Sequence, residues 1–153
     1  VDNLRGILVK HDIEAGDLFL EVTESAYTKD SDQIISTVKV LRKWGFRIEM
    51  DDFGNGYSSQ NMLSTLPIDA LKLDMEFVRN AFRKQKDPKM LEIIIGIADY
   101  LGVPVVAEGV ETDEQIEALQ AIGCDIAQGF YFDRPLPKEA MEKRLTGCLY
   151  DIE

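Results

Sequence analysis

Acidic side chains follow one another closely in the stretch RIEMDDFGNGYSS, residues 47–59. Asp51 and Asp52 stand side by side after an apolar run, and a turn rich in glycine and serine follows them at once. The simplest interpretation is the start of a polar loop. The alternative is a cation site, because two neighbouring aspartates can serve a pair of metal ions.

Similar polar clusters end the other apolar runs of the chain. They comprise Glu21 and Glu24, Lys72 and Asp74, Glu108 and Glu111, and Gln128. Several also have an ordinary structural explanation: Glu24 could cap the following turn, Asp74 could begin a helix, and Glu111 could favour a helix dipole. Their convergence favours a site, because unrelated surface acids need not gather at successive strand ends.

The chemistry expected of such a set is the cleavage of a phosphate ester with two metal ions. Clustered carboxylates repel one another unless cations neutralise them, and hard oxygen ligands suit Mg²⁺, Mn²⁺ or Ca²⁺. Two ions about 3.5–4 Å apart activate a water on one side and stabilise the leaving oxygen on the other. Lys72 would add fixed positive charge beside the water or the phosphate.

The elements that must position these residues alternate between strands and helices. The hydrophobic pattern predicts strands over residues 18–24, 46–52, 69–74, 103–111 and 124–130. Weaker patterns predict helices over residues 4–11, about 76–84 and 138–146. Three helices with clear signals are predicted from a Ser31 cap to Gly45, from Asp87-Pro88 to Gly102, and from a Thr112–Gln115 capping box to Gly123.

This order predicts an α/β fold with a parallel sheet and right-handed crossovers. Polar groups at the C-terminal ends of many strands favour a (β/α) TIM-like barrel. A doubly wound sheet would carry a glycine-rich phosphate turn after its first strand, and none is present. The predicted strands are too few to close a barrel, so we expect an incomplete one that self-associates through its open edges or faces.

Composition limits the partners. The chain has 153 residues, 45% hydrophobic, with a formal net charge of −11, which argues against a nucleic-acid polymer as partner. Its apolar stretches are too short to cross a membrane, and no membrane contact is expected from this segment. Cys124 and Cys148 lack metal-ligand spacing and are interpreted as reduced thiols of a cytoplasmic protein, whose parent could be membrane-anchored through other domains.

Five segments together resemble the EAL-domain family, a group of bacterial phosphodiesterases that open the signalling dinucleotide cyclic di-GMP. The segments LEVTES, MDDFGNGYSS, LKLD, VVAEGVET and AQGFYFDRPLP occur in the family's order and spacing, from about residue 4 to residue 140. The resemblance implies a modified (β/α) barrel with two Mg²⁺ or Mn²⁺ ions at its strand ends. The implied reaction is hydrolysis of cyclic di-GMP to linear pGpG.

The resemblance also implies metal ligands. Glu21 would bind one metal, Asp51 would bridge both, and Asp52 would belong to the second. Glu108 would reach that second metal or its bound water.

Further roles are implied around these ligands. Lys72 would lie beside the hydrolytic water, which Gln128 would help to position. Glu24, Asp74 and Glu111 would hold the metal ligands in place without binding metal themselves, and Glu24 would steady the DFGNGYSS loop.

Departures from the family pattern are as informative. In the family, a signature Glu-Ala-Leu segment and a downstream asparagine, both metal ligands, precede the part that this chain matches. Residues 1–153 are therefore expected to be the C-terminal part of a single EAL domain, without the strands that carry those ligands. Within the loop, Asn55 stands where threonine is common, and Gln60 and Asn61 stand where an apolar residue is usual.

Two functions remain open at this point. The parent protein could be an active cyclic di-GMP phosphodiesterase, or a degenerate signalling module that binds cyclic di-GMP without cleaving it. Retention of Lys72, both aspartates and Glu108 favours the enzyme. The chain by itself is expected to have little or no activity.

Overall fold

A computed structural model describes residues 2–54, 62, 65–82, 89–124 and 126–147. The loop departures Asn55, Gln60 and Asn61, together with Asp87, Pro88 and Cys148, lie outside these residues. The elements in chain order are α1 (Asp2–His11), the 3₁₀ turn η1 (Ala15–Asp17), β1 (Phe19–Thr23), α2 (Glu24–Lys29), α3 (Ser31–Lys43), β2 (Arg47–Phe53), β3 (Ala70–Leu73), α5 (Met75–Ala81), α6 (Lys89–Tyr100), β4 (Val105–Glu108), α7 (Asp113–Ala121), β5 (Ile126–Gln128) and α8 (Lys138–Gly147).

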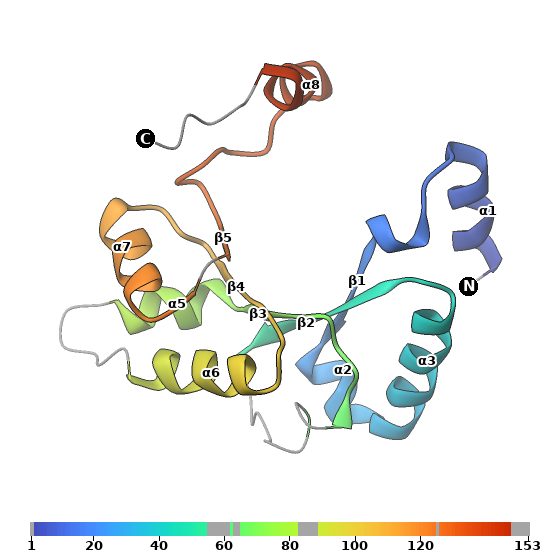
Figure 1. Ribbon diagram of the computed structural model, residues 1–153, viewed down its shortest axis with the longest axis horizontal. Coiled ribbons are helices and arrows are strands. Elements are labelled where there is room, and N and C mark those ends of the chain that lie inside the picture. Colours follow the sequence, from blue (N-terminus) through green and yellow to red (C-terminus); the bar gives the residue numbers. More distant parts are fainter. Residues whose placement is uncertain (1, 55–61, 63–64, 83–88, 125, 148–153) are drawn as a thin grey trace.

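The five strands form one sheet in the order β1-β2-β3-β4-β5, and every neighbouring pair is parallel. Figure 1 shows the strands crossing the centre of the molecule with helices on the connections between them. Each predicted strand is present; β2 is displaced by one residue from its predicted range, and the other four are shorter than predicted. The predicted α/β fold with a parallel sheet is therefore confirmed.

The hydrophobic core lies between one face of this sheet and the helices. Ile48 and Met50 of β2, Leu71 and Leu73 of β3, and Ala107 of β4 are wholly buried. Apolar side chains of α3, α5, α6 and α7 belong to the same cluster. Because strand residues alternate between faces, the intervening positions, which include Glu21, Glu49 and Lys72, lie on the opposite face.

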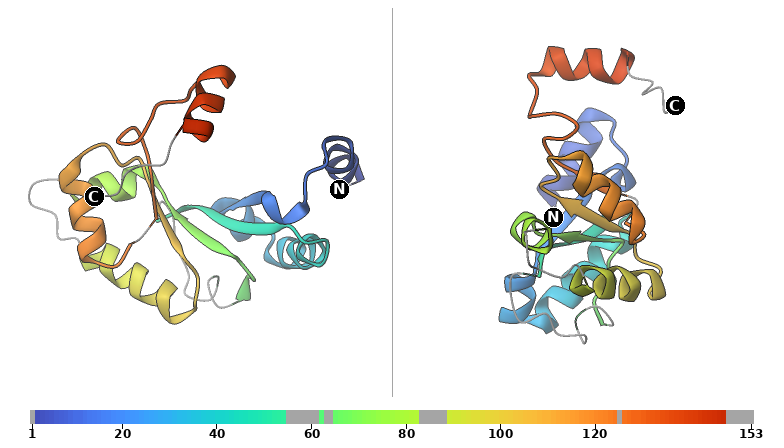
Figure 2. Two further views of the ribbon diagram at one scale, coloured as in Figure 1. Left: turned by 45° about the horizontal axis from the view of Figure 1, so that its top comes forward. Right: turned by 90° about the vertical axis from the view of Figure 1, so that its left-hand side faces the viewer.

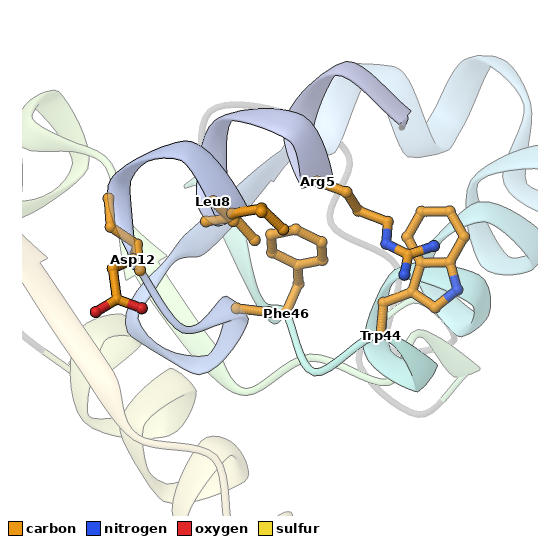
Figure 3. A pocket seen from close by; sticks show the side chains of 8 residues that line it. Arg5, Leu8, Asp12, Trp44 and Phe46 are labelled. Atoms are coloured by element: carbon orange, nitrogen blue, oxygen red, sulfur yellow. The ribbon is translucent and has the colours of Figure 1, made fainter.

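The peripheral helices α1 and α8 stand apart from the rest of the fold in Figures 1 and 2. Near α1, Leu8 points toward the ring of Phe46 (Figure 3), which is only 3% exposed. The guanidinium of Arg5 lies 5.2 Å from the centre of the Trp44 ring. These residues line a hollow of about 370 Å³ at the N-terminal ends of β1 and β2, so the side chains flanking the end of α3 pack against α1.

Some helix boundaries differ from the prediction. Asp30, and not Ser31, caps α3, because the Asp30 carboxylate accepts a hydrogen bond from the backbone N–H of Gln33 at 3.1 Å. The short helix α2 and the turn η1 were not predicted, since neither contains a full period of apolar residues. The Thr112–Gln115 capping box is confirmed, with both of its hydrogen bonds formed.

Two edges bound the sheet within the described part of the chain. They are β1 and β5, each hydrogen-bonded to a neighbouring strand on one side. Phe19 on β1 and Ile126 on β5 are exposed. Self-association through these edges stays a prediction. No helix among the described residues is long and apolar enough to span a bilayer.

Truncation of Leu71 tests the position of the core. The side chain is 0% exposed on the central strand β3. We expect Leu71→Ala to lower the free energy of unfolding by about 2–5 kcal/mol, because it removes buried contacts and leaves a cavity. Urea denaturation measures the change. The matched control is Val9→Ala on α1, where the side chain is 84% exposed and the expected change is under about 0.5 kcal/mol; equal losses would contradict this placement of the core.

Candidate active site

The ammonium of Lys72 lies at the centre of the acidic rim. Its Nζ is 2.5 Å from Oε1 of Glu21 on β1, 2.7 Å from Oε1 of Glu108 on β4 and 3.4 Å from Oδ1 of Asp51 on β2. Lys72 itself belongs to β3, so four successive strands each contribute one charged group. The expected convergence of these four residues is therefore present in the fold.

Burial and charge act in opposite directions on Lys72. The side chain is only 10% exposed, and this burial by itself lowers its pKa. The hydrogen bonds to Glu108 and Glu21, together with the charges of Glu108 and Asp51, outweigh burial and raise the pKa of Lys72 above its ordinary value. The group is thus a permanent cation that the surrounding carboxylates hold in place.

The neighbours Asp51 and Asp52 both lie within an irregularity of β2. The pairing register between β2 and β3 shifts between Met50 and Phe53, and Asp52 has a left-handed backbone with φ of 58°. Desolvation, then the charges of Asp51 and Asp74, raise the pKa of the Asp52 carboxyl. The carboxylates of Asp51 and Asp74 are therefore near enough for their charges to act on Asp52.

Gln128 ends β5 and is the register partner of Glu108. The next residue is Gly129, where an added Cβ would collide with the backbone of Val110. Close approach at this point lets the N–H of Val110 donate to the carbonyl of Gln128 at 3.2 Å. Gln128 also lines a hollow of about 720 Å³ that extends toward α8, so its position beside Glu108 is determined by the backbone.

The three supporting acids have distinct places. Glu24 is buried at the start of α2. Asp74 is the N-cap of α5, where its Oδ1 accepts hydrogen bonds from the N–H groups of Glu76 at 2.7 Å and Phe77 at 3.1 Å. Glu111 pairs with Arg79 at 2.5 Å, so a structural role is visible for Asp74 and Glu111.

One acid of this face was missed by the sequence reasoning. Glu49 lies two residues before Asp51 on β2 and is the register partner of Glu21. Only strand ends were considered, whereas the period of two along β2 already placed Glu49 on the same face as Asp51. Burial raises the pKa of Glu49, the Lys72 ammonium opposes this rise, and the charges of Glu21, Asp51 and Glu108 add to it.

The donor set suits hard divalent cations in its chemistry. Carboxylate oxygens from β1, β2 and β4 already surround one positive charge, and such oxygens are the ligands that Mg²⁺ and Mn²⁺ prefer. Among the described residues, no three histidine, cysteine, aspartate or glutamate side chains are arranged to hold a metal ion as they stand. The Lys72 ammonium occupies the space between three of the carboxylates.

Comparison with known proteins gives a consistent result. The model of the EAL domain matches residues 1–135. The chain is 42% identical over 151 residues to the cyclic di-GMP phosphodiesterase NbdA of Pseudomonas aeruginosa, covering 99% of this chain and 19% of the relative. The chain thus spans about a fifth of that protein's length.

Solved structures show the same likeness. The structure described as PaMucR phosphodiesterase in complex with c-di-GMP matches with a TM-score of 0.85 and 38% identity, covering 92% of this chain and 57% of that one. A Klebsiella pneumoniae BlrP1 complex with manganese and cyclic di-GMP matches with a TM-score of 0.80 and 35% identity, covering 86% of this chain and 34% of the BlrP1 chain. The predicted TIM-like class of the fold is confirmed by these matches.

Removal of the central ammonium tests the electrostatics of the rim. We expect Lys72→Met to lower the free energy of unfolding by about 2–3 kcal/mol, because three carboxylates then face one another without a counter-charge. The loss should stay below that of a fully buried pair, since the side chain of Glu21 is 49% exposed. Urea denaturation at neutral pH gives the measurement. Arg42→Met, which breaks the more exposed pair with Asp69, is the control and should cost under about 1 kcal/mol; similar costs would refute the central role of Lys72.

Substitution of Asp74 separates its cap from its charge. Asp74→Ala removes the acceptor for two N–H groups of α5 and should cost about 1 kcal/mol of stability. Asp74→Asn keeps an acceptor and should change stability by less than about 0.5 kcal/mol. Thermal and urea unfolding of both variants provide the comparison. If asparagine destabilises as much as alanine, the cap is not the main role of Asp74.

Proposed function

The chain belongs to the EAL domain family, and from this we propose that it carries the catalytic rim of a domain that hydrolyses cyclic di-GMP to linear pGpG. The observation that supports this proposal is the convergence of Glu21, Asp51 and Glu108 on Lys72 from four adjacent strands. NbdA, which is 42% identical to the chain, is named a cyclic di-GMP phosphodiesterase. The PaMucR structure contains c-di-GMP.

The proposed metal site uses the carboxylates of the rim. Glu21, Asp51, Asp52 and Glu108 would hold two Mg²⁺ or Mn²⁺ ions, with Asp51 between them. Bound there, the ions would supply a water of lowered pKa and would neutralise charge on the phosphoryl oxygens. The manganese in the BlrP1 complex, a structure 35% identical to this chain, supports a divalent cation in this family.

The side chains around the metals would orient the substrate and the water. Lys72 has only N–H donors, so it would hold a phosphate oxygen or the attacking water and would take no proton from either. Gln128, next to Glu108 in the sheet, would direct the same water through its amide. Glu24, Asp74 and Glu111 would keep the rim in place through α2, α5 and the Arg79 pair.

A second candidate function is the degenerate module that binds cyclic di-GMP without cleaving it. Such a module needs contacts to the ligand but has no need of a charged lysine enclosed by carboxylates. The contacts of Lys72 with Glu21, Asp51 and Glu108 therefore favour the enzyme. We propose in addition that residues 1–153 are the C-terminal part of one EAL domain. The coverage of 57% of the PaMucR chain supports this.

Turnover of cyclic di-GMP with Mn²⁺ tests the proposal. We expect the complete parent protein to form pGpG and its Asp51→Asn variant to be slower by roughly a hundredfold or more, since one bridging carboxylate is lost. The 153-residue chain alone should show little or no turnover. Liquid chromatography of the products measures all three rates.

The control variant is Asp99→Asn in the same parent protein. Asp99 lies at the C-terminal end of α6, which leads back to the start of β4, so it is remote from the rim. Its rate should be unchanged. Equal turnover by the Asp51→Asn variant and the parent would rule out the two-metal proposal, and turnover by the chain alone at the parental rate would rule out the incomplete domain.

A further inference from the structure

A further carboxylate, that of Glu49, lies beneath the site and has none of the roles described above. Glu49 on β2 is the register partner of Glu21 on β1 and of Ala70 on β3, and Ala70 is two residues before Lys72. Partners in a parallel sheet point to the same face, as do residues two apart on a strand. Glu49 is therefore one layer below the ion pairs of Lys72, on the same face, and is half-buried.

The surroundings of Glu49 are charged but provide no partner. Lys72, Glu21, Asp51 and Glu108 all act on its carboxylate electrostatically. Within the described part of the chain, its side chain makes no hydrogen bond or ion pair. A half-buried carboxylate among three like charges is unfavourable unless a cation approaches it. The Lys72 ammonium could do so if it left its present ion pairs with Glu21, Asp51 and Glu108.

Divalent cations would change the partners of Lys72. The oxygens proposed to bind metal, on Glu21, Asp51 and Glu108, are the same ones that hold the ammonium. When metals take them, Lys72 loses its counter-charges while its side chain stays in a site that is only 10% exposed. A buried cation without a partner is strongly unfavourable, so another acceptor is needed within reach.

Other acids near the rim are already engaged. Asp74 caps α5, and Glu111 pairs with Arg79. Asp69, next to Ala70, accepts from Arg42 and from the N–H of Ile48. Glu49 is the acid on this face of β2 and β3 that has neither a partner nor a proposed metal.

We propose that Glu49 is a positioning residue, whose carboxylate takes over the Lys72 ammonium when divalent cations bind Glu21, Asp51 and Glu108. This inference rests on the proposed two-metal site. The exchange keeps the ammonium charged and enclosed beside the metals, and it lowers the repulsion between the ammonium and the incoming cations. Glu49 thus supports metal binding by acting through Lys72.

A double-mutant cycle on divalent-cation affinity tests this. Isothermal titration of the 153-residue chain with Mn²⁺ is performed on the wild type, Glu49→Gln, Lys72→Met and the double variant. We expect Glu49→Gln to weaken Mn²⁺ binding roughly tenfold in the wild-type background, because the ammonium then stays among the metal ligands. In the Lys72→Met background the same substitution should weaken binding less than about threefold, since no ammonium remains to be held.

Controls separate this role from net charge and from misfolding. Asp99→Asn removes one remote carboxylate and should leave Mn²⁺ affinity unchanged. Glu49→Asp keeps the charge and should retain more affinity for Mn²⁺ than Glu49→Gln. If circular dichroism finds the glutamine variant unfolded, the aspartate variant replaces it in the cycle, and the shorter side chain should still weaken binding more in the wild-type background than in the Lys72→Met background. Melting temperatures with and without Mn²⁺ provide a second readout.

The outcomes distinguish the two proposals. If the wild type binds Mn²⁺ saturably and Glu49→Gln binds it equally well, the role of Glu49 is overturned and the metal site is not. An equal weakening in both backgrounds would also overturn it, because Glu49 would then act by net charge and not through Lys72. Absence of saturable Mn²⁺ binding by the wild type would overturn the metal site and this inference together.

Discussion

The whole rim depends on one buried positive charge. Lys72 loses hydration on β3, and among the described residues the carboxylates that compensate it come from β1, β2 and β4. Those carboxylates would in turn repel one another without it. Neither side of this arrangement is stable alone, so the ammonium and the acids specify each other's positions. Strand register is what brings them together, and the hydrophobic face formed by residues such as Met50 and Leu71 fixes that register.

The adjacent aspartates show how the backbone adapts to this requirement. In a regular strand, Asp51 and Asp52 would point to opposite faces. The register shift after Met50 and the left-handed φ of 58° at Asp52 break this alternation. Such a backbone costs about 1–3 kcal/mol for most residues, and aspartate tolerates it better than most. A conformational cost at this one point of β2 agrees with the proposal that both aspartates bind metal.

Much of this arrangement could be predicted from local patterns, and the failures have physical causes. The strands and most helices were predictable because apolar periodicity and caps such as Thr112–Gln115 are local signals. Convergence at the rim followed from parallel pairing. Contacts between residues far apart in sequence were not predictable: the ion pair of Lys72 with Glu21 depends on strand register, and that of Arg79 with Glu111 depends on how α5 lies beside the end of β4. The period of two along β2 could have predicted the face on which Glu49 lies, but not its register with Glu21. The position of Asp74 was typical both of a helix N-cap and of a residue in the site, and the sequence alone did not decide between these two roles.

The geometry also separates binding from catalysis. Within the described part of the chain, the ion pairs of Lys72 join side chains from β1, β2, β3 and β4, which are successive neighbours in the sheet. The cluster therefore needs the pairing of these strands and not the closure of a barrel. The proposed cation site would therefore need only these strands of the five-stranded sheet. Positioning a phosphodiester between two metals demands a full set of ligands within a fraction of an ångström. On the proposals made above, an arc of strands would therefore retain cation affinity and lack the precision that turnover needs.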